Sequence, residues 1–378
     1  MRQPLFGKKT LVCVGPGGVG KTTTAAAFGV IGARAGLRTL VCTIDPAPRL
    51  ADALGVPGLA AQPTPIAAAT ASALGVPAPG LYAMRVDPGA AFASLVREQV
   101  ADPELRDHIF ANPLYRQVTT ELTGSHEYAA TLALFELRRS GAYDLIVLDT
   151  PPTANALEFL ETPQRLAQAI ASPAVQWFAR PDPKTSRLTS RFSLRRLGMG
   201  GASIIRRAGK LMGNQFLDDL GAFLLDIRQV LGGFLLRARE IEAVLKQPDV
   251  GFVLVMTPET AAVDEALAFG RRLRATGVSL CGYVANRTLT QAGSLGADAI
   301  AQELAALPGA QDLAGEATLT KLTRLASYLD TIARAQEREL ERLARESPGL
   351  DITTIPLLAH DVSNLESLRA IADRLESG

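Results

Sequence analysis

The chain has 378 residues, 47% of them hydrophobic and 20% charged, a balance that is typical of globular proteins and excludes disordered and fibrous classes. Lysine and arginine number 39 against 38 aspartate and glutamate residues, so the net charge of +1 gives no global attraction to nucleic acid, and we expect no nucleic-acid partner. The three cysteines, Cys13, Cys42 and Cys281, form no CxxC pair, which argues against a disulfide framework and a four-thiolate zinc site.

The apolar runs of the sequence are short. None approaches the roughly 18 residues that cross a bilayer, so we expect no stable membrane insertion. The first run, Leu11–Val14, is also too short for the core of a signal peptide. These features together predict a cytoplasmic protein.

Predicted strands and helices alternate along the chain, with an Ala-rich helix over 23–35 and a charged helix around 327–345. Continuous apolar strands are typical of a parallel sheet that is buried on both faces. We therefore expect a doubly wound, mostly parallel α/β sheet flanked by helices, with ligands at the carboxyl ends of the strands. The Ala-, Pro- and Gly-rich stretch 51–80 is expected to be a long surface loop with at most one helical turn. The predicted strands are 10–14, 39–44, 81–86, 143–148, 250–256, 279–285 and 352–355.

The first predicted strand leads into Gly15-Pro-Gly-Gly-Val-Gly-Lys-Thr22, which matches the phosphate-binding loop G-x-x-x-x-G-K-[ST] at every fixed position. Glycines let backbone N–H groups surround an anion, and the N-terminus of the following helix adds partial positive charge. Lys21 is expected to reach the phosphates of a nucleotide, and the Thr22 hydroxyl to ligate Mg²⁺. The candidate nucleotide-binding residues of this loop are Gly15, Gly17, Gly18, Val19, Gly20, Lys21, Thr22 and Thr23.

Two aspartates follow predicted strands. Asp149 begins the run Asp149-Thr-Pro-Pro-Thr153 and fits the acidic residue that holds Mg²⁺ in phosphate-loop enzymes. A simple helix cap is the alternative, which the two prolines disfavour. Asp45, in Asp45-Pro-Ala47, is a candidate for orienting the attacking water and for contacting the metal, whereas an ordinary Asp-Pro turn is the alternative.

These segments together resemble the ArsA-type ATPases, a family of deviant phosphate-loop enzymes with an arsenical-pump branch and a branch that targets tail-anchored proteins. Gly17–Thr23 is similar to their phosphate loop and Asp45-Pro-Ala47 to their first switch, while Asp149–Thr153 is similar to the second switch of a bacterial DTPPT subgroup. The resemblance covers residues 9–175 and 250–375. It implies one ArsA-like ATPase domain over 1–378 that uses ATP and Mg²⁺.

The resemblance also implies roles for individual residues. Lys21 and Asp45 would be catalytic, and Thr22, Asp45 and Asp149 would serve the metal. Asn286 matches an adenine-contacting asparagine, although a strand-end turn is the alternative, and Pro356 would lie in a loop that covers the base. The chain contains no Lys-x-Asp sequence of the kind that guanine-specific phosphate-loop proteins use, which favours ATP over GTP.

The sequence departs from the family pattern at two places. Pro16 stands where the family has an extra lysine that crosses a dimer interface to the partner's phosphates, and Ala154-Asn155 replaces a Gly-His pair. One phosphate loop per chain implies that a two-site machine needs a second chain, as a homodimer or as a heterodimer with a paralogue. We expect slow hydrolysis by the isolated subunit, completed by a lysine-bearing paralogue or by an arginine elsewhere.

The middle of the chain, 164–246, is predicted to form an inserted helical subdomain. Nine basic residues and one acidic residue lie within 180–210, followed by an amphipathic apolar run over 211–236. In the protein-targeting branch, helices at this position hold a client's apolar helix, so 211–236 is a candidate client surface. Packing of these residues onto their own domain is the alternative. The favoured interpretation of the basic run is a solvated, mobile loop, and the alternatives are a surface for anionic phospholipid, RNA or an acidic partner.

The favoured function is a Mg-ATP-hydrolysing dimeric switch that couples nucleotide state to a protein or transport partner. Arsenite transport itself is disfavoured because the cysteines lie within apolar strands. A membrane- or nucleoid-associated positioning ATPase is one alternative, but it predicts a basic C-terminal helix, whereas 365–375 is balanced in charge. A weakly active nucleotide-binding scaffold is the other alternative, because Pro16 supplies no charge.

Overall fold

The structure is a computed structural model that describes residues 7–113, 115, 125–150, 168, 226, 232–290, 297–306, 315–358 and 364–377. The chain divides into two compact units. The sheet unit comprises Met1–Arg85, Glu136–Leu157 and Lys246–Gly378, and the helical unit comprises Val86–Phe135 and Glu158–Leu245. Most of the predicted subdomain 164–246, including the basic run 180–210, lies outside the described residues.

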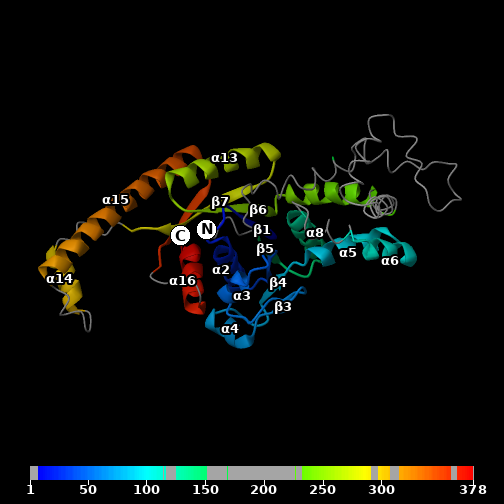
Figure 1. Cartoon of the computed structure of the whole chain (residues 1–378), viewed down its shortest axis with the longest axis horizontal. Helices are drawn as coiled ribbons and strands as arrows, with labels where there is room; N and C mark the ends of the chain where they lie inside the picture. The colour runs from blue at the N-terminus through cyan, green and yellow to red at the C-terminus, as the bar shows by residue number, and fades with distance from the viewer. Residues whose placement is uncertain are drawn as a thin grey trace, which may run out of the picture. The chain divides into compact units, whose positions relative to one another are not determined.

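Eight strands form one sheet in the order β3-β4-β2-β5-β1-β6-β7-β8. Neighbouring strands are parallel except for β3 and β4, which are antiparallel. This sheet, with helices around it, confirms the predicted doubly wound α/β fold (Figure 1). The strands are β1 (Thr10–Val14), β2 (Thr39–Thr43), β3 (Thr64–Pro65), β4 (Leu81–Arg85), β5 (Leu145–Asp149), β6 (Val250–Met256), β7 (Leu280–Thr288) and β8 (Asp351–Pro356).

The central strands are apolar because they are covered on both faces. Every residue of β1, β2, β5 and β6 is buried. Their register brings chemistry to one end of the sheet: Asp149 lies opposite Cys13 on one side and Thr43 on the other. The phosphate loop that follows β1 therefore starts beside the side chains of Asp149 and Thr43. We call the end of the sheet at which these parallel strands stop its carboxyl edge.

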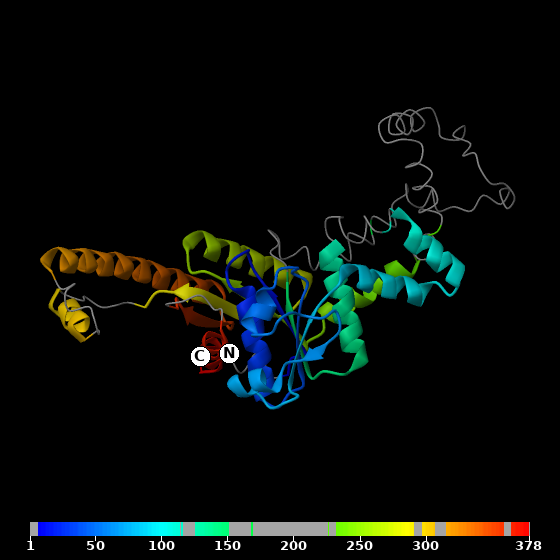
Figure 2. The same ribbon diagram turned by 60° about the horizontal axis from the view of Figure 1, so that its bottom comes forward.

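Helix α2 (Lys21–Arg34) follows the phosphate loop and packs directly on the sheet (Figure 2). Two of its residues are glycines, and a Cβ at Gly29 would collide with Val41, so the absence of a side chain allows the close approach. Helix α16 (Leu365–Ser377) lies along α2 and buries its apolar face, and Arg34 binds Asp373 across the two helices.

The stretch 51–80 contains more regular structure than the predicted loop. Its segments include α3 (Arg49–Ala53), strand β3 and α4 (Ala68–Ala73). The loop prediction was wrong here because Leu50, Leu54 and Leu74 are buried and anchor the short helices to the core. Other described helices of the sheet unit are α13 (Thr260–Thr276), α14 (Ala297–Ala306) and α15 (Glu316–Glu346).

The helical unit has its own aromatic cluster, although only part of it is described. Helices α5 (Pro88–Gln99) and α6 (Pro103–Ala111) belong to it, α8 (Ser125–Ser140) continues from it into the sheet unit, and 232–245 is helical. The rings of Phe92, Tyr128 and Phe234 pack against one another. Among the described residues no helix is long and apolar enough to cross a membrane.

Candidate functional site

The phosphate loop depends on two glycines for its shape. Gly15 and Gly20 have φ angles of 147° and 95°, which side-chain-bearing residues rarely adopt. A Cβ at Gly15 would collide with the carbonyl oxygen of Val255 on β6, and one at Gly20 with the side-chain amide of Asn286 on β7. The loop is therefore threaded between strand ends, as expected for a cradle built from backbone N–H groups.

Lys21 is stored beneath this loop. Its side chain is 6% exposed, and its ammonium group donates a hydrogen bond to the carbonyl oxygen of Pro16 at 2.8 Å. Burial lowers the pKa of Lys21, although the negative charge of Asp149 opposes this effect. The Lys21 ammonium group is desolvated and bonded to a neutral carbonyl, so an anion that enters the loop stabilises it electrostatically.

The Asp149 carboxylate is buried, and only one of its two oxygens is hydrogen-bonded to a described residue. Its Oδ2 accepts hydrogen bonds from the hydroxyls of Thr22 at 2.7 Å and Thr43 at 3.0 Å. Its Oδ1 is also buried, yet it has no hydrogen-bond partner among the described residues. Burial raises the pKa of Asp149 to about 6, and the two hydroxyl donors only partly offset this rise. A nearby cation would relieve the cost of ionising this carboxylate.

The donor set at Asp149 fits magnesium bound together with a nucleotide. Mg²⁺ prefers oxygen ligands and usually takes only one or two from the protein, the rest being water and phosphate. The Thr22 hydroxyl and the open Oδ1 of Asp149 supply that chemistry. Within the described residues there is no group of three or more His, Cys, Asp or Glu side chains able to hold a metal without such help.

Asp45 is fully engaged in this structure. Its Oδ1 accepts the backbone N–H of Ala47 at 2.9 Å, and its Oδ2 pairs with the guanidinium of Arg49 at 3.1 Å. Its own backbone N–H donates to the Thr43 hydroxyl, which in turn donates to Asp149. Asp45 thus belongs to the network of the carboxyl edge, and its role with water or metal stays a prediction.

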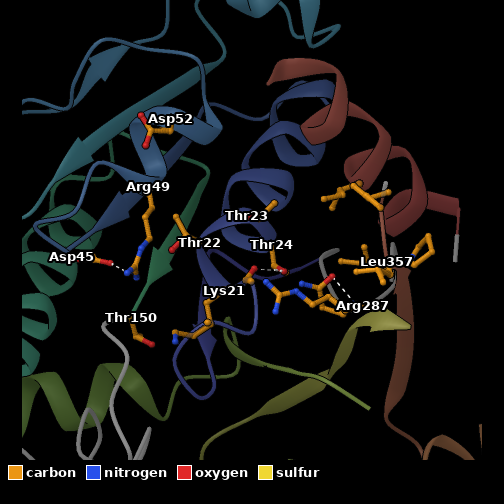
Figure 3. A pocket seen from close by; sticks show the side chains of 17 residues that line it. Lys21, Thr22, Thr23, Thr24, Asp45, Arg49, Asp52, Thr150, Arg287 and Leu357 are labelled. Atoms are coloured by element: carbon orange, nitrogen blue, oxygen red, sulfur yellow. Dashed lines mark hydrogen bonds and ion pairs between the residues drawn. The ribbon is translucent and has the colours of Figure 1, made fainter. Parts of the chain in front are cut away.

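A cavity of about 470 Å³ lies over the phosphate loop. Figure 3 shows Lys21, Thr22, Asp45 and Arg49 on one side of it, and Arg287 and Leu357 on the other. The residues that line it include Gly18, Gly20, Lys21, Thr22, Thr23, Asp45, Arg49, Asp52, Thr150, Asn286, Arg287, Pro356 and Leu357. Most of the residues predicted from the sequence are therefore gathered in one place.

Asn286 and Pro356 also line the cavity. The amide of Asn286 donates to the carbonyl oxygen of Val19 at 2.8 Å, so this side chain braces the phosphate loop. Pro356 is the last residue of β8 and not part of a loop, because β8 pairs with β7 up to that position. Their predicted contacts with adenine stay predictions. The second-switch residues after Thr150 lie outside the described residues.

Several residues of the site were not predicted from the sequence, and two of them, Thr43 and Arg49, contact predicted residues directly. Thr43 is a hydroxyl at the end of an otherwise apolar strand, and its burial beside Asp149 follows only from the strand order. Arg49 lies four residues after Asp45, the spacing at which side chains meet on a helix. That spacing was the available signal.

These features place the chain among the phosphate-loop nucleotide-binding proteins of α/β fold. The comparisons are more specific: the family model of the anion-transporting ATPases, the ArsA ATPases, matches residues 8–298. The chain belongs to this family of ATPases, and the resemblance noted in the sequence is confirmed.

Two relatives illustrate the range of similarity. An uncharacterized protein of Streptomyces coelicolor is 37% identical over 163 residues, which is 43% of this chain and 39% of that protein. The ATPase get3 of Aspergillus terreus is 24% identical over 380 residues, covering 99% of this chain and 93% of that protein. The chain thus spans less than half of the first relative and nearly all of the second.

Proposed function

We propose that this chain is a Mg-ATP-hydrolysing switch that works as a dimer and couples its nucleotide state to a protein or transport partner. The observation that carries the proposal is the buried Asp149 carboxylate, which accepts a hydrogen bond from the phosphate-loop hydroxyl of Thr22 and has one oxygen without a partner among the described residues. Membership of an ATPase family supports the same reaction.

The residues of the carboxyl edge divide the work of hydrolysis. Lys21 would move its hydrogen bond from the Pro16 carbonyl to the phosphates, and Thr22 and Asp149 would hold Mg²⁺. When bound, the metal would neutralise charge that develops on the phosphates. Asp45 would orient the attacking water once its carboxylate is released from Arg49. Asn286 and Pro356, which also line the cavity, would contact the base.

The dimer is proposed because the chain has one phosphate loop, and a two-site machine then needs a second copy or a paralogue. Pro16 offers no charge to a partner, so hydrolysis by the isolated subunit should be slow. The proposed client surface, 211–236, lies outside the described residues except for 226 and 232–236. An apolar helix of a client protein remains the partner proposed for it.

Helix α16 is not available as a membrane anchor. Its apolar residues are buried within the sheet unit, whereas a membrane-binding amphipathic helix exposes them. These residues are Leu368, Ile371, Ala372 and Leu375.

Phosphate release from ATP tests the proposal directly. Wild-type turnover should require Mg²⁺, stop with EDTA and favour ATP over GTP. Lys21→Ala should lower turnover roughly 10³-fold, because it removes a preorganised charge from a dry site. Lys8→Ala is the control, since the Lys8 ammonium group donates to the Pro248 carbonyl and to Ser279, and Lys8 is not among the residues that line the cavity. Equal turnover in Lys21→Ala and wild type would contradict the proposal.

A further inference from the structure

Among the described residues, three positively charged side chains line the cavity, namely Lys21, Arg49 and Arg287. They are not placed alike. Lys21 is buried beneath the loop, and Arg287 lies beside Leu357 on the far side (Figure 3). Arg49 extends from α3 toward the part of the cavity where Thr22 and Asp45 lie (Figure 3). It is therefore the cation that faces the phosphate end from outside the loop.

The phosphate loop itself is poor in charge. Position 16 is a proline, which carries neither a charge nor an N–H donor, and its carbonyl oxygen occupies the ammonium group of Lys21. The other loop positions before Lys21 are glycines and Val19. A nucleoside triphosphate that enters the loop thus meets only one cation from the loop and its helix, and its terminal phosphate needs another.

The present partner of Arg49 holds it weakly. The Arg49 side chain is 61% exposed, whereas that of Asp45 is 14% exposed, and the two pair over an i,i+4 spacing. Water and salt screen a pair whose cation is this exposed, so the pair contributes little. A guanidinium matches the oxygens of a phosphate in a two-point fork, and charge-assisted bonds of that geometry are among the strongest in proteins. The exchange of a carboxylate for a phosphate is therefore favourable.

We propose that Arg49 contacts the terminal phosphate of the bound nucleotide and, in doing so, releases Asp45. This inference rests on the proposed function and adds a cation that acts within the same chain. In the resting state Arg49 neutralises Asp45, and the arrival of the terminal phosphate draws the guanidinium away. The Asp45 carboxylate then becomes free to orient water only when a triphosphate, and not a diphosphate, is bound.

The test is the equilibrium binding of two probes, ADP and a non-hydrolysable ATP analogue. Each is measured in the presence of Mg²⁺. Arg49→Ala should weaken binding of the ATP analogue roughly 10- to 100-fold, the range of one charged hydrogen-bond contact, and change ADP binding less than about twofold. Arg49→Lys should fall between wild type and Arg49→Ala, because it keeps the charge without the fork.

Arg334→Ala is the matched control. Arg334 is 59% exposed and forms the same i,i+4 pair with Asp330 on α15, outside the residues that line the cavity. Its substitution should leave the binding of both probes unchanged. A similar loss for ADP and the ATP analogue in Arg49→Ala, or no loss for either, overturns the inference while the proposed ATPase stands. A wild-type chain that binds neither probe overturns both.

Discussion

The two edges of the central sheet use their charges in opposite ways. At the amino edge, where the parallel strands begin, the guanidinium of Arg138 donates to Thr10, Gln247 and Asp249 and is nearly saturated within the chain. The guanidinium of Arg38 lies over the rings of both Tyr82 and Tyr143 at the same edge. These guanidinium groups stabilise the fold through contacts within the chain and have little capacity left to bind a ligand.

At the carboxyl edge the same sheet leaves polar groups incompletely used. Lys21 has a neutral carbonyl as its hydrogen-bond partner, and the Oδ1 of Asp149 has none among the described residues. Both groups are costly to keep buried in their charged forms, because burial lowers the pKa of Lys21 and raises that of Asp149. The comparison teaches that stability and binding are assigned to opposite ends of the same strands.

Asp45→Asn should sharpen the comparison most. The asparagine keeps an oxygen for the Ala47 N–H but loses the charge that orients water, so turnover should fall about 10²-fold. Binding of Mg-ATP should change less than about threefold. Phosphate release and equilibrium binding measured on the same preparation check this split. Turnover equal to that of wild type would remove Asp45 from the mechanism.

Asp149→Asn should separate stability from function by pH. The pKa of the folded carboxyl is about 6 against 3.8 as its ordinary value, so the wild type is relatively most stable below pH ~4 and loses that advantage as pH rises through 6. The two-unit shift corresponds to about 3 kcal/mol. The asparagine lacks this titration.

In EDTA, therefore, the free energy of unfolding of Asp149→Asn minus that of wild type should increase by about 3 kcal/mol between pH 4 and pH 7. Urea unfolding at both pH values measures it. The same variant should lose Mg²⁺-dependent turnover, because its amide cannot replace the carboxylate beside the metal. A difference in stability that does not change with pH would show that Asp149 is ionised at little cost.

Arg138→Ala tests the amino edge, where the expected effects are reversed. The Arg138 side chain is 13% exposed, and its loss leaves Asp249 and Gln247 without their common donor. The free energy of unfolding should fall by about 1–3 kcal/mol. Turnover at a temperature well below the melting point should match that of wild type. A large loss of turnover in the folded variant would break the separation between the two edges.

The strands and the phosphate loop could be predicted because their signals are local. Four buried strands read as continuous apolar runs, and Gly15 to Thr22 match a fixed pattern that has few structural alternatives. The structure of 51–80 was missed because its short helices have little intrinsic stability and form only through the burial of residues such as Leu54.

The parts of the site that could not be predicted depend on strand order. Nothing near Thr43 in the sequence indicates that β2 and β5 are neighbours, yet that pairing puts its hydroxyl on Asp149. The brace from Asn286 to the phosphate loop likewise joins residues that are 267 positions apart. Motifs therefore identified the groups that bind, while the groups that hold them in place required the fold.

Pro16→Lys is expected to have the smallest effect in the wild type and a larger one without Arg49. A lysine at this position resembles the family pattern, and in a dimer it would add positive charge at the partner's phosphates. If Arg49 already contacts the terminal phosphate, Pro16→Lys should raise wild-type turnover only about threefold. The same change should raise the turnover of Arg49→Ala about tenfold, because the effects of two cations on one phosphate do not add. The measurement is phosphate release from wild type, Pro16→Lys, Arg49→Ala and the double variant, which together form a double-mutant cycle. Sedimentation follows dimer formation in each. Equal gains in both backgrounds would mean that position 16 and Arg49 act on different groups, and Arg49 would then lose its role as the substitute for the missing lysine.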